Sequence, residues 1–370
     1  MAGGHATHIA TNLALIATFL ASIYVPPVAK TIGGDTNGLV TENRRLATPP
    51  HLAFDRKGLK RLPRQIETYY DDNFGLRNFF IRWHNRLLVK VLGISPSQRV
   101  IIGRDGWLFY GGDYVLDDYR STKPFSTRDL TFVQKSIEER EAWLRQRGIR
   151  YLLVLVPNKH TIYPEFLPRW VNRVGSRSRA NQLIHHMMGN SLVNILDLRM
   201  ALMTAKAEHR IYDKTGTHWN CYGALVGYEQ LMLVVAQWFP SMRVSPRQAF
   251  VVDTKEHQGG DLARMLNLAD VLPERVVTVE KDSEICPRGE EGKPRPHAKS
   301  RVMRVRRPGV MLPRLLMFGD SFGGKLVPYL SEHFSEIVFV GSGFIPELVH
   351  TEHPDIVVEQ MVERRLMKYP

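Results

Sequence analysis

An apolar segment without charges stands close to the start of the chain. Residues 13–28 read LALIATFLASIYVPPV and contain no charged side chain, although Pro26 and Pro27 interrupt the end of the run. With residues 9–12 the segment approaches the roughly 20 residues that cross a bilayer as a helix. No small-residue cleavage pattern follows, so we expect residues 1–29 to be an uncleaved signal anchor. A cleaved signal peptide and a buried core helix are the alternatives.

Polar and helical patterns follow this segment. Residues 30–64 are polar and rich in proline, which is typical of a linker, and we expect residues 65–370 to form one domain. A helical pattern begins at residue 65 and ends at Gly93. Residues 99–112 (RVIIGRDGWLFYGG) predict two short strands around an Arg-Asp-Gly turn, and residues 128–147 predict a charged amphipathic helix.

From residue 151 onward, short apolar runs alternate with helical patterns. The expected strands are 151–156, 193–198, 315–318, 337–340 and 356–358. The expected helices are 176–188, a segment ending near 207, 221–239 and about 323–334. This alternation predicts an α/β fold with a parallel sheet and helices on both faces. Ligands of such sheets bind beyond the carboxyl ends of the strands, which would bring Asn158, Ser321 and the loop after Val340 together.

Charge and cysteine content limit the classes of function. The formal net charge of +13 favours contact with polyanions of some kind. Residues 288–314 hold nine Lys or Arg and two acids, which indicates either a solvated basic loop or a guide for an acidic polymer. This run has no aromatic residue, so nucleic acid is not expected as a partner. Cys221 and Cys286 fit no metal spacing, and we expect thiols more than a disulfide.

Two short motifs indicate serine chemistry. LMFGDSF at 316–322 runs from a strand into a turn, a context that exposes the hydroxyl of Ser321 and brings backbone N–H groups beside it. A serine needs a base to accept its proton, and His218 in THWN at 217–220 is the natural candidate. The sequence therefore predicts Ser321 as nucleophile and His218 as base, with the Ser321 N–H and Asn158 as candidate oxyanion donors. No metal or other cofactor is predicted.

An ordered series of motifs makes the comparison with a family possible. The motifs are ENRRLATPP, DDNFGLRNFF, IGRDGWLFYGG, LVPNKHTIYP, TGTHWNCYGA, GGDLARML and FGDSF. In this order they resemble the SGNH hydrolase-like domain of the alginate O-acetyltransferase family, AlgJ and AlgX, in which the histidine motif also precedes the serine motif. The resemblance implies transfer of acetyl through an acyl-enzyme to a sugar hydroxyl. It also implies a membrane-bound O-acyltransferase as acetyl donor and a periplasmic protein anchored to the inner membrane.

One position departs from the family pattern. The family motif commonly has an Asp two residues before the histidine, and this chain has Gly216 there. Asp213 is our first candidate for the group that orients His218, a backbone carbonyl is the second, and an inactive site is the third possibility. Loss of an orienting carboxylate can lower kcat by about 10⁴ without abolishing catalysis. Asp320 is a further candidate, although its place before the nucleophile is more typical of a turn-shaping residue.

Four residues besides Ser321 and His218 are candidates for substrate binding. Asn158 and Lys159 follow a strand end, where a solvated loop is the alternative. Trp219 is a candidate platform for a sugar ring, or else a core residue. Arg264 is a candidate for binding a substrate carboxylate, although a structural pair with Asp261 is favoured.

We therefore expect an extracytoplasmic O-acetyltransferase that acts on an exopolysaccharide, and the basic run at 288–314 favours an acidic one. An acetyl esterase of the same fold and a non-catalytic polymer-binding component of an export complex are the alternatives. The sequence does not identify the polymer.

Overall fold

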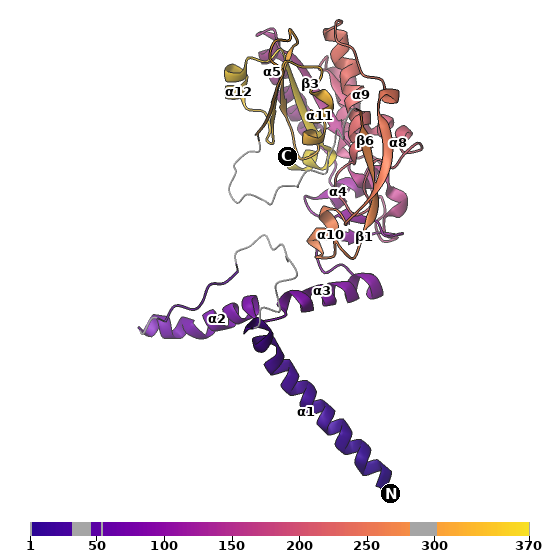
Figure 1. Cartoon of the computed structure of the whole chain (residues 1–370). Coiled ribbons are helices and arrows are strands. Elements are labelled where there is room, and N and C mark those ends of the chain that lie inside the picture. The colour runs from indigo at the N-terminus through magenta and orange to yellow at the C-terminus, as the bar shows by residue number, and fades with distance from the viewer. Residues whose placement is uncertain (1, 32–45, 53–54, 282–301, 370) are drawn as a thin grey trace. The chain divides into compact units, whose positions relative to one another are not determined.

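The chain is described here by a computed structural model that covers residues 2–31, 46–52, 55–281 and 302–369 (Figure 1). Contacts between residues divide it into two compact units. The first unit consists of residues 1–96 and 264–268, and the second of residues 97–263 and 269–370. The boundaries expected from the sequence, at residues 29 and 64, stay predictions.

Helices make up most of the first unit. They are α1 (Ala2–Thr31), α2 (Arg56–Asn73), α3 (Arg77–Leu87) and the short π-helix η1 (Leu88–Leu92). Within α1, His8–Lys30 is long and apolar enough to cross a membrane, and its side chains are mostly exposed. The apolar N-terminal helix is thus confirmed, and Pro26 and Pro27 lie inside it rather than ending it.

A break separates α2 from α3, where the sequence pattern suggested continuous helix from residue 65 to 93. Leu76 adopts a left-handed backbone conformation with φ of 64°. The preceding Gly75 packs so closely on α1 that a Cβ atom there would lie 1.9 Å from the carbonyl oxygen of Pro26. Only glycine fits this contact, and helical periodicity alone does not reveal it.

A six-stranded sheet forms the centre of the second unit. In spatial order its strands are β4 (Ile195–Asp197), β3 (Arg150–Val156), β10 (Ile356–Val362), β8 (Arg314–Phe318), β9 (Glu336–Val340) and β7 (Val302–Arg306). All neighbouring pairs are parallel except β7 with β9. The predicted α/β class with a mostly parallel sheet is confirmed. The loops after β3, β8 and β9 leave the same edge of this sheet, as expected from their strand directions.

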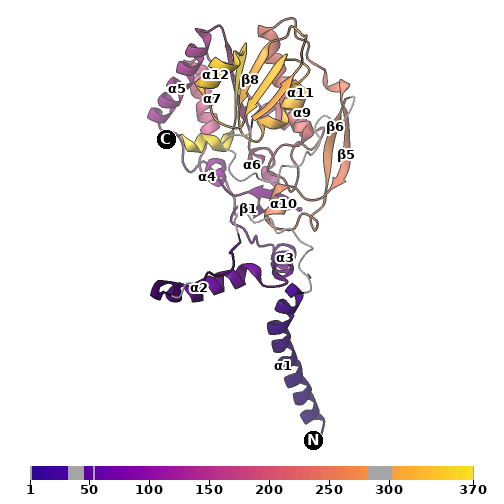
Figure 2. The same cartoon turned by 60° about the vertical axis from the view of Figure 1, so that its left-hand side comes forward.

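Helices cover both faces of the sheet because its strands are apolar on both sides (Figure 2). One face packs against α5 (Thr127–Arg145), α7 (Arg179–Asn190) and α12 (Pro346–Glu352). The other packs against α8 (Arg199–Ala205), α9 (Cys221–Trp238) and α11 (Val327–Leu330). Side chains of β3 alternate between the two faces. Leu153 packs on the side of α5, α7 and α12, and Val154 packs on the side of α8, α9 and α11.

Smaller elements complete the unit. The predicted strand pair is β1 (Val100–Ile102) with β2 (Leu108–Tyr110). The hairpin of β5 (Val251–His257) and β6 (Glu274–Glu280) was not predicted. The short helices and turns are α4 (Val115–Arg120), α6 (Lys159–Ile162), η2 (Pro164–Phe166), η3 (Arg247–Ala249), α10 (Asp261–Met265), η4 (Gly323–Lys325) and η5 (Glu363–Lys368).

The helix expected at 323–334 is only a 3₁₀ turn, η4, followed by the short α11. Pro328 stands at the start of α11, where its missing N–H is tolerated, and it cannot continue a helix that begins a turn earlier.

The described part of the basic stretch 288–314 is only partly a loop, at residues 307–313. Residues 302–306 form the edge strand β7, and residues 288–301 lie outside the described part of the chain. Glu336 accepts hydrogen bonds from Arg306 at 2.7 Å and from Arg314 at 2.9 Å. Arg304 binds Glu352 at 2.7 Å. These three arginines are therefore matched by local carboxylates.

The packing of the sheet yields a test of stability. Leu316 is fully buried in β8, and we expect Leu316→Ala to lower the free energy of unfolding by about 3 kcal/mol because it leaves a cavity in a close-packed core. Urea denaturation monitored by near-ultraviolet circular dichroism measures this loss. The matched control is Leu192→Ala, at a fully exposed leucine, which should change the free energy by less than about 0.5 kcal/mol. Equal effects of the two substitutions would contradict the assigned core.

Candidate active site

Ser321 lies in the turn that leaves the carboxyl end of β8. The carboxylate of Asp320 holds this turn, because its Oδ1 accepts the N–H of Phe322 at 3.0 Å and its Oδ2 accepts the N–H of Val362 at 2.9 Å. The side-chain amide of Gln360 also donates to Asp320 Oδ1, at 3.0 Å. These bonds fix Asp320 to the end of β10, which agrees with a turn-shaping role. Ser321 itself is exposed.

His218 reaches this serine from the loop before α9. Its Nε2 lies 2.7 Å from Ser321 Oγ, although the two residues are 103 positions apart in the chain. Asn220 caps the start of α9 by accepting the N–H of Gly223 at 3.0 Å, and its own N–H donates to the carbonyl of Ile211 at 2.9 Å. The pair expected from the two motifs is therefore at hydrogen-bond distance, the arrangement that proton transfer from the hydroxyl requires.

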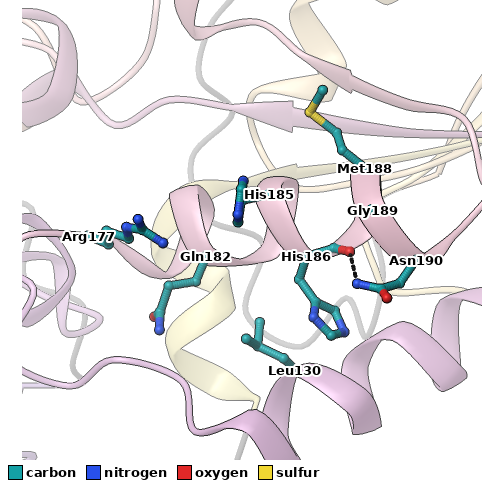
Figure 3. A pocket seen from close by; sticks show the side chains of 8 residues that line it. All are labelled: Leu130, Arg177, Gln182, His185, His186, Met188, Gly189 and Asn190. Carbon is teal, nitrogen blue, oxygen red and sulfur yellow. Dashed lines mark hydrogen bonds between the residues drawn. The ribbon is translucent and has the colours of Figure 1, made fainter.

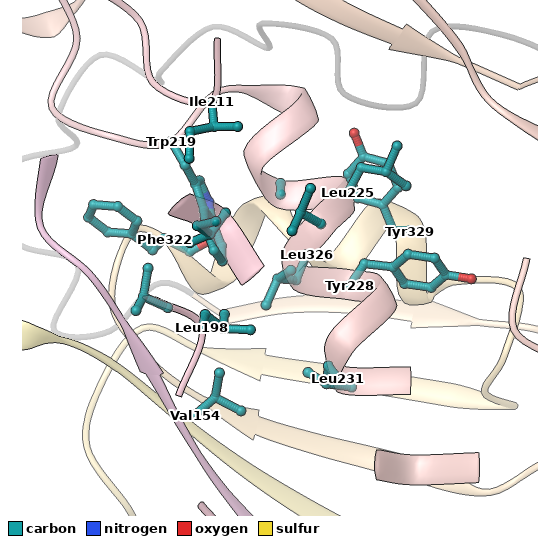
Figure 4. Close-up of a cluster of buried hydrophobic side chains, with 14 of the residues drawn as sticks. Val154, Leu198, Ile211, Trp219, Leu225, Tyr228, Leu231, Phe322, Leu326 and Tyr329 are labelled. Carbon is teal, nitrogen blue, oxygen red and sulfur yellow. The ribbon is translucent and has the colours of Figure 1, made fainter. Parts of the chain in front are cut away.

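Trp219 joins the histidine segment to the serine segment. Its indole is fully buried, packs edge-on against Phe322 with ring centres 5.8 Å apart, and donates Nε1–H to the Phe322 carbonyl at 3.2 Å (Figure 4). Lys325 donates to the Trp219 carbonyl at 2.8 Å. A ring enclosed in this way offers no face to a sugar, so the geometry corresponds to the core alternative rather than to a stacking platform.

Asp261, the first residue of α10, stands behind the histidine. Its Oδ2 lies 3.6 Å from His218 Nδ1, and its Oδ1 accepts the N–H of Thr217 at 2.7 Å. The side chains of His218 and Asp261 are each 18% exposed. A carboxylate placed here favours the tautomer with a proton on Nδ1, which leaves Nε2 able to accept a proton from Ser321. From the sequence we expect Asp261 only as a structural partner of Arg264, so sequence reasoning missed this neighbour of His218.

The glycine at 216 has a structural counterpart in Gly260. A Cβ atom on Gly260 would lie 2.9 Å from the Gly216 Cα, so the two backbones touch. A Cβ on Gly216 would lie 3.5 Å from Asp261 Oδ1 and 3.4 Å from the Asp213 Cβ. The absence of a side chain at 260 therefore allows the two backbones to touch, whereas a Cβ at 216 would make only ordinary van der Waals contacts. Asp213, our first candidate, is buried close to the same glycine.

Lys159 is buried and not part of a solvated loop. Its ammonium donates to the carbonyls of Leu108, Asp213, Lys214 and Gly216 at 2.6, 2.7, 2.8 and 3.0 Å. Burial lowers the pKa of Lys159 to about 7, and the carboxylates of Glu274, Asp213 and Asp261 oppose that change.

The neighbouring His160 is also buried, and its ring lies 5.1 Å from that of Phe109. Burial lowers the pKa of His160 to about 3. Both residues therefore belong to the protein interior, and Lys159 holds the backbone that leads to His218.

Asn158 belongs to a buried polar network beside the sheet edge. Its Nδ2 donates to Asp118 Oδ2 at 2.9 Å, its N–H donates to Glu363 at 2.8 Å, and its Oδ1 accepts from Arg364 at 3.0 Å. Burial, and next the negative charge of Glu363, raise the pKa of Asp118 to about 7. The Arg364 guanidinium lies 5.6 Å from the ring of Phe322, so this network adjoins the serine turn, which the sequence did not indicate.

Arg264 and a pocket beside α7 lie outside the candidate site. Arg264 is exposed at the end of α10. Among the described residues, no group of three His, Cys, Asp or Glu side chains could hold a metal ion. A pocket of about 550 Å³ is lined mainly by α7, with Leu130 from α5 (Figure 3). It contains none of the candidate site residues, and we assign it no part in catalysis.

Comparison with known proteins now identifies the family. Residues 100–341 match the model of a family described as the SGNH hydrolase-like domain of the acetyltransferase AlgX. The chain belongs to this family. The family resemblance is thereby confirmed, and five of its seven motifs, including the histidine and serine motifs, lie inside the matched region.

Curated relatives carry the name probable alginate O-acetylase AlgJ. The chain is 28% identical over 205 residues to the protein from Pseudomonas syringae pv. tomato, which covers 55% of this chain and 50% of the relative. It is 24% identical over 234 residues to the protein from Pseudomonas aeruginosa, covering 61% and 57%. The chain thus spans about half the length of the curated relatives it matches.

Two solved structures are similar to this chain. PatB1 of Bacillus cereus superposes with a TM-score of 0.51 at 13% identity, covering 71% of this chain and 95% of that one. The O-acetyltransferase domain of Pseudomonas putida AlgJ gives a TM-score of 0.46 at 22% identity, covering 72% and 91%. The likeness to PatB1 shows a shared fold at a sequence identity too low to say more.

The contacts of Lys159 lead to a second prediction. We expect Lys159→Met to lower the free energy of unfolding by about 3 kcal/mol, because several buried carbonyls lose their charged donor. Urea denaturation measures the loss, and Lys135→Met, on the exposed side of α5, is the control. If Lys159→Met unfolds at the same urea concentration as the control, the ammonium does not support this segment.

Proposed function

We propose that this protein is an extracytoplasmic O-acetyltransferase, which transfers acetyl groups to hydroxyls of an exopolysaccharide through an acyl-enzyme on Ser321. The observation that carries the proposal is the 2.7 Å separation of His218 Nε2 and Ser321 Oγ at the edge of an SGNH hydrolase-like sheet. The alternative family role, non-catalytic binding, was motivated only by Gly216. The carboxylate of Asp261, 3.6 Å from His218 Nδ1, supports a catalytic role instead.

In the first half-reaction, Ser321 Oγ attacks the carbonyl carbon of the acetyl donor while His218 Nε2 accepts the hydroxyl proton. When the bond from the acetyl carbon to the leaving oxygen breaks, the imidazolium returns that proton to the leaving oxygen. In the second half-reaction a sugar hydroxyl gives its proton to His218 and attacks the acetyl-serine. Ser321 Oγ then leaves and regains the proton.

The backbone N–H groups of the serine turn are candidate donors to the oxyanion. The N–H of Phe322 donates to Asp320 Oδ1 at 3.0 Å and that of Gly323 donates to the Asp320 carbonyl at 3.1 Å. These two amides are engaged in the turn, so the N–H of Ser321 is our first proposed donor to the oxyanion. Asn158 remains the proposed second donor through the amide hydrogen that does not bind Asp118.

Asp261 is proposed as the orienting residue, in place of Asp213. The hydrogen bond from the Thr217 N–H fixes one carboxylate oxygen, and the other faces His218 Nδ1. During proton transfer the imidazole becomes positively charged, and a nearby carboxylate stabilises that state.

Partners and location follow from the same proposal. An exposed serine suits a polymeric acceptor, which cannot enter a closed cavity. The relatives are named for alginate, and we extend to this chain only the broader class of exopolysaccharide. A membrane-bound O-acyltransferase is the proposed acetyl source. The apolar helix α1 is the proposed anchor that holds the protein on the periplasmic side of the inner membrane.

The nucleophile is tested by Ser321→Ala. Incubated with an activated acetyl ester and candidate oligosaccharides, the parent chain should produce acetylated sugar, detected by mass spectrometry, and a transient acetyl adduct on the protein. The variant should produce neither, because it has no hydroxyl to acylate. Ser342→Ala, at a hydroxyl that bonds to Gly343 in the loop after β9, is the matched control. Release of acetate without acetylated sugar would support the esterase instead, and an active Ser321→Ala would exclude both.

The orienting carboxylate is tested by Asp261→Asn. We expect kcat/KM for the acetyl ester to fall by up to about 10⁴, as when a triad loses its carboxylate. The acidic limb of the pH profile should move to lower pH, because the protonated imidazole loses its counter-charge.

Two further variants sharpen this test. Asp253→Asn, on the exposed β5, should leave the rate unchanged. The double variant Gly216→Asp/Asp261→Gly should recover part of the activity that Asp261→Asn loses, because it restores the Asp of the common family motif. A larger loss from Asp213→Asn than from Asp261→Asn would return the orienting role to Asp213.

A further inference from the structure

A row of large apolar side chains is exposed along α3 and η1. Trp83 is 59% exposed and Val91 is 70% exposed. The complete row, spaced by three or four residues apart from its first two members, is Phe79, Phe80, Trp83, Leu87, Val91 and Ile94. This spacing places the members within α3 and η1 on one side of the helix, and Ile94 follows the end of η1. We call this row the apolar stripe.

The opposite side of the same helix is the side that packs. Asn85 is buried, and its side chain donates to the carbonyl of Leu266 at 2.8 Å, within the first unit. Asn85 is two residues from both Trp83 and Leu87, which puts it about 200° around the helix from each. The stripe therefore faces away from the residues that α3 contacts, and an exposed row of this size marks an interaction surface.

The position of α3 next to α1 indicates what covers the stripe. Gly75, in the break between α2 and α3, packs against the carbonyl of Pro26 and the backbone of Lys30 near the C-terminal end of α1. The Lys30 ammonium lies 5.1 Å from the ring of Tyr69 in α2. In Figures 1 and 2 the C-terminal end of α1 lies beside the break between α2 and α3. If α1 spans a bilayer, the break lies at the level of the lipid headgroups.

Charge is the second indication. The first half of α2 contains five cations, Arg56, Lys57, Lys60, Arg61 and Arg64, and no acid. In α3 and η1 the exposed Arg86 and Lys90 flank the stripe. A helix with aromatic and aliphatic residues on one side and cations beside them is typical of segments that lie in the plane of a membrane surface. Cations near such a surface gain stability from anionic lipids.

We propose that α3 and η1 lie along an anionic lipid surface with the apolar stripe inserted at the level of the headgroups, and that the cations of α2 contact lipid phosphates. The inference rests on the membrane anchor of the proposed function and goes beyond it. It assigns the membrane contact to the first unit as a whole and not to α1 alone.

Spin labels on the full chain test this contact. Single cysteines are introduced by Val91→Cys in the stripe, Phe19→Cys in α1 and Leu192→Cys in the second unit, and the labelled parent chain serves as the blank for Cys221 and Cys286. Each variant is placed in nanodiscs of phosphatidylcholine with phosphatidylglycerol, and collisions with oxygen and with a water-soluble nickel chelate are measured. Val91 lies about 20 Å along the helix from Arg77, so α1 alone does not hold it at the lipid.

The proposal expects the label at 91 to collide often with oxygen and several-fold less with nickel than the label at 192. Frequent nickel collisions at 91 would overturn it, and so would low collision rates with both reagents, which would indicate a protein partner or a second copy of the chain. Equal protection in phosphatidylcholine alone would overturn the assignment to an anionic surface. The label at 19 reports the anchor separately: protection at 19 without protection at 91 rejects the surface contact and leaves the anchor of the proposed function intact.

Discussion

The ammonium group of Lys159 is the contact on which the geometry around His218 depends. Lys159 follows the end of β3 in the sequence. Its ammonium donates to the carbonyl of Leu108 in β2 and to the carbonyls of Asp213, Lys214 and Gly216. A buried charged group needs several hydrogen-bond acceptors. A change in the path of the chain through residues 213–216 would therefore expose the ammonium or remove its acceptors. The sheet edge and the histidine loop are thereby joined at the backbone, before any side chain of the candidate site is considered.

A second link completes the chain of constraints. Trp219 follows His218 directly and bonds to the carbonyl of Phe322, which follows Ser321 directly. The side chains of the candidate pair, Ser321 and His218, are exposed or partly exposed, whereas the residues next to them are buried. Rigid support from the interior keeps the side chains of Ser321 and His218 aligned at the surface.

Much of the sheet and the Ser321–His218 pair could be predicted from the sequence. The strands are short, continuous apolar runs, and the carboxyl ends of parallel strands share one edge, so Asn158 and Ser321 were expected at the same edge. Local pattern also predicted β1 and β2. The role of Lys159 was misjudged because a lysine after a strand usually reaches solvent, and nothing in its neighbours reveals four carbonyls gathered from distant segments.

Asp261 was missed for a related reason. It contacts the amide of Thr217 across 44 residues of chain, and its position depends on the β5–β6 hairpin, which has no clear signal in the sequence. The break at Gly75 was missed because helical periodicity continues through it, and only the approach of α1 excludes a side chain there. In each case a tertiary contact decides, and a local pattern holds no information about it.

The touching backbones of Gly216 and Gly260 have a consequence for how this site can change. Since a Cβ at 260 would lie 2.9 Å from the Gly216 Cα, a side chain at 260 requires the segment around residue 216 to move, and a substitution in one loop alters what is permitted in the other. The effects of substitutions in the two loops should therefore be non-additive, with an interaction energy of the kind found between residues in contact. A carboxylate that moves from one loop to the other is then accompanied by changes in both loops, so a family member can keep its chemistry while its histidine motif changes.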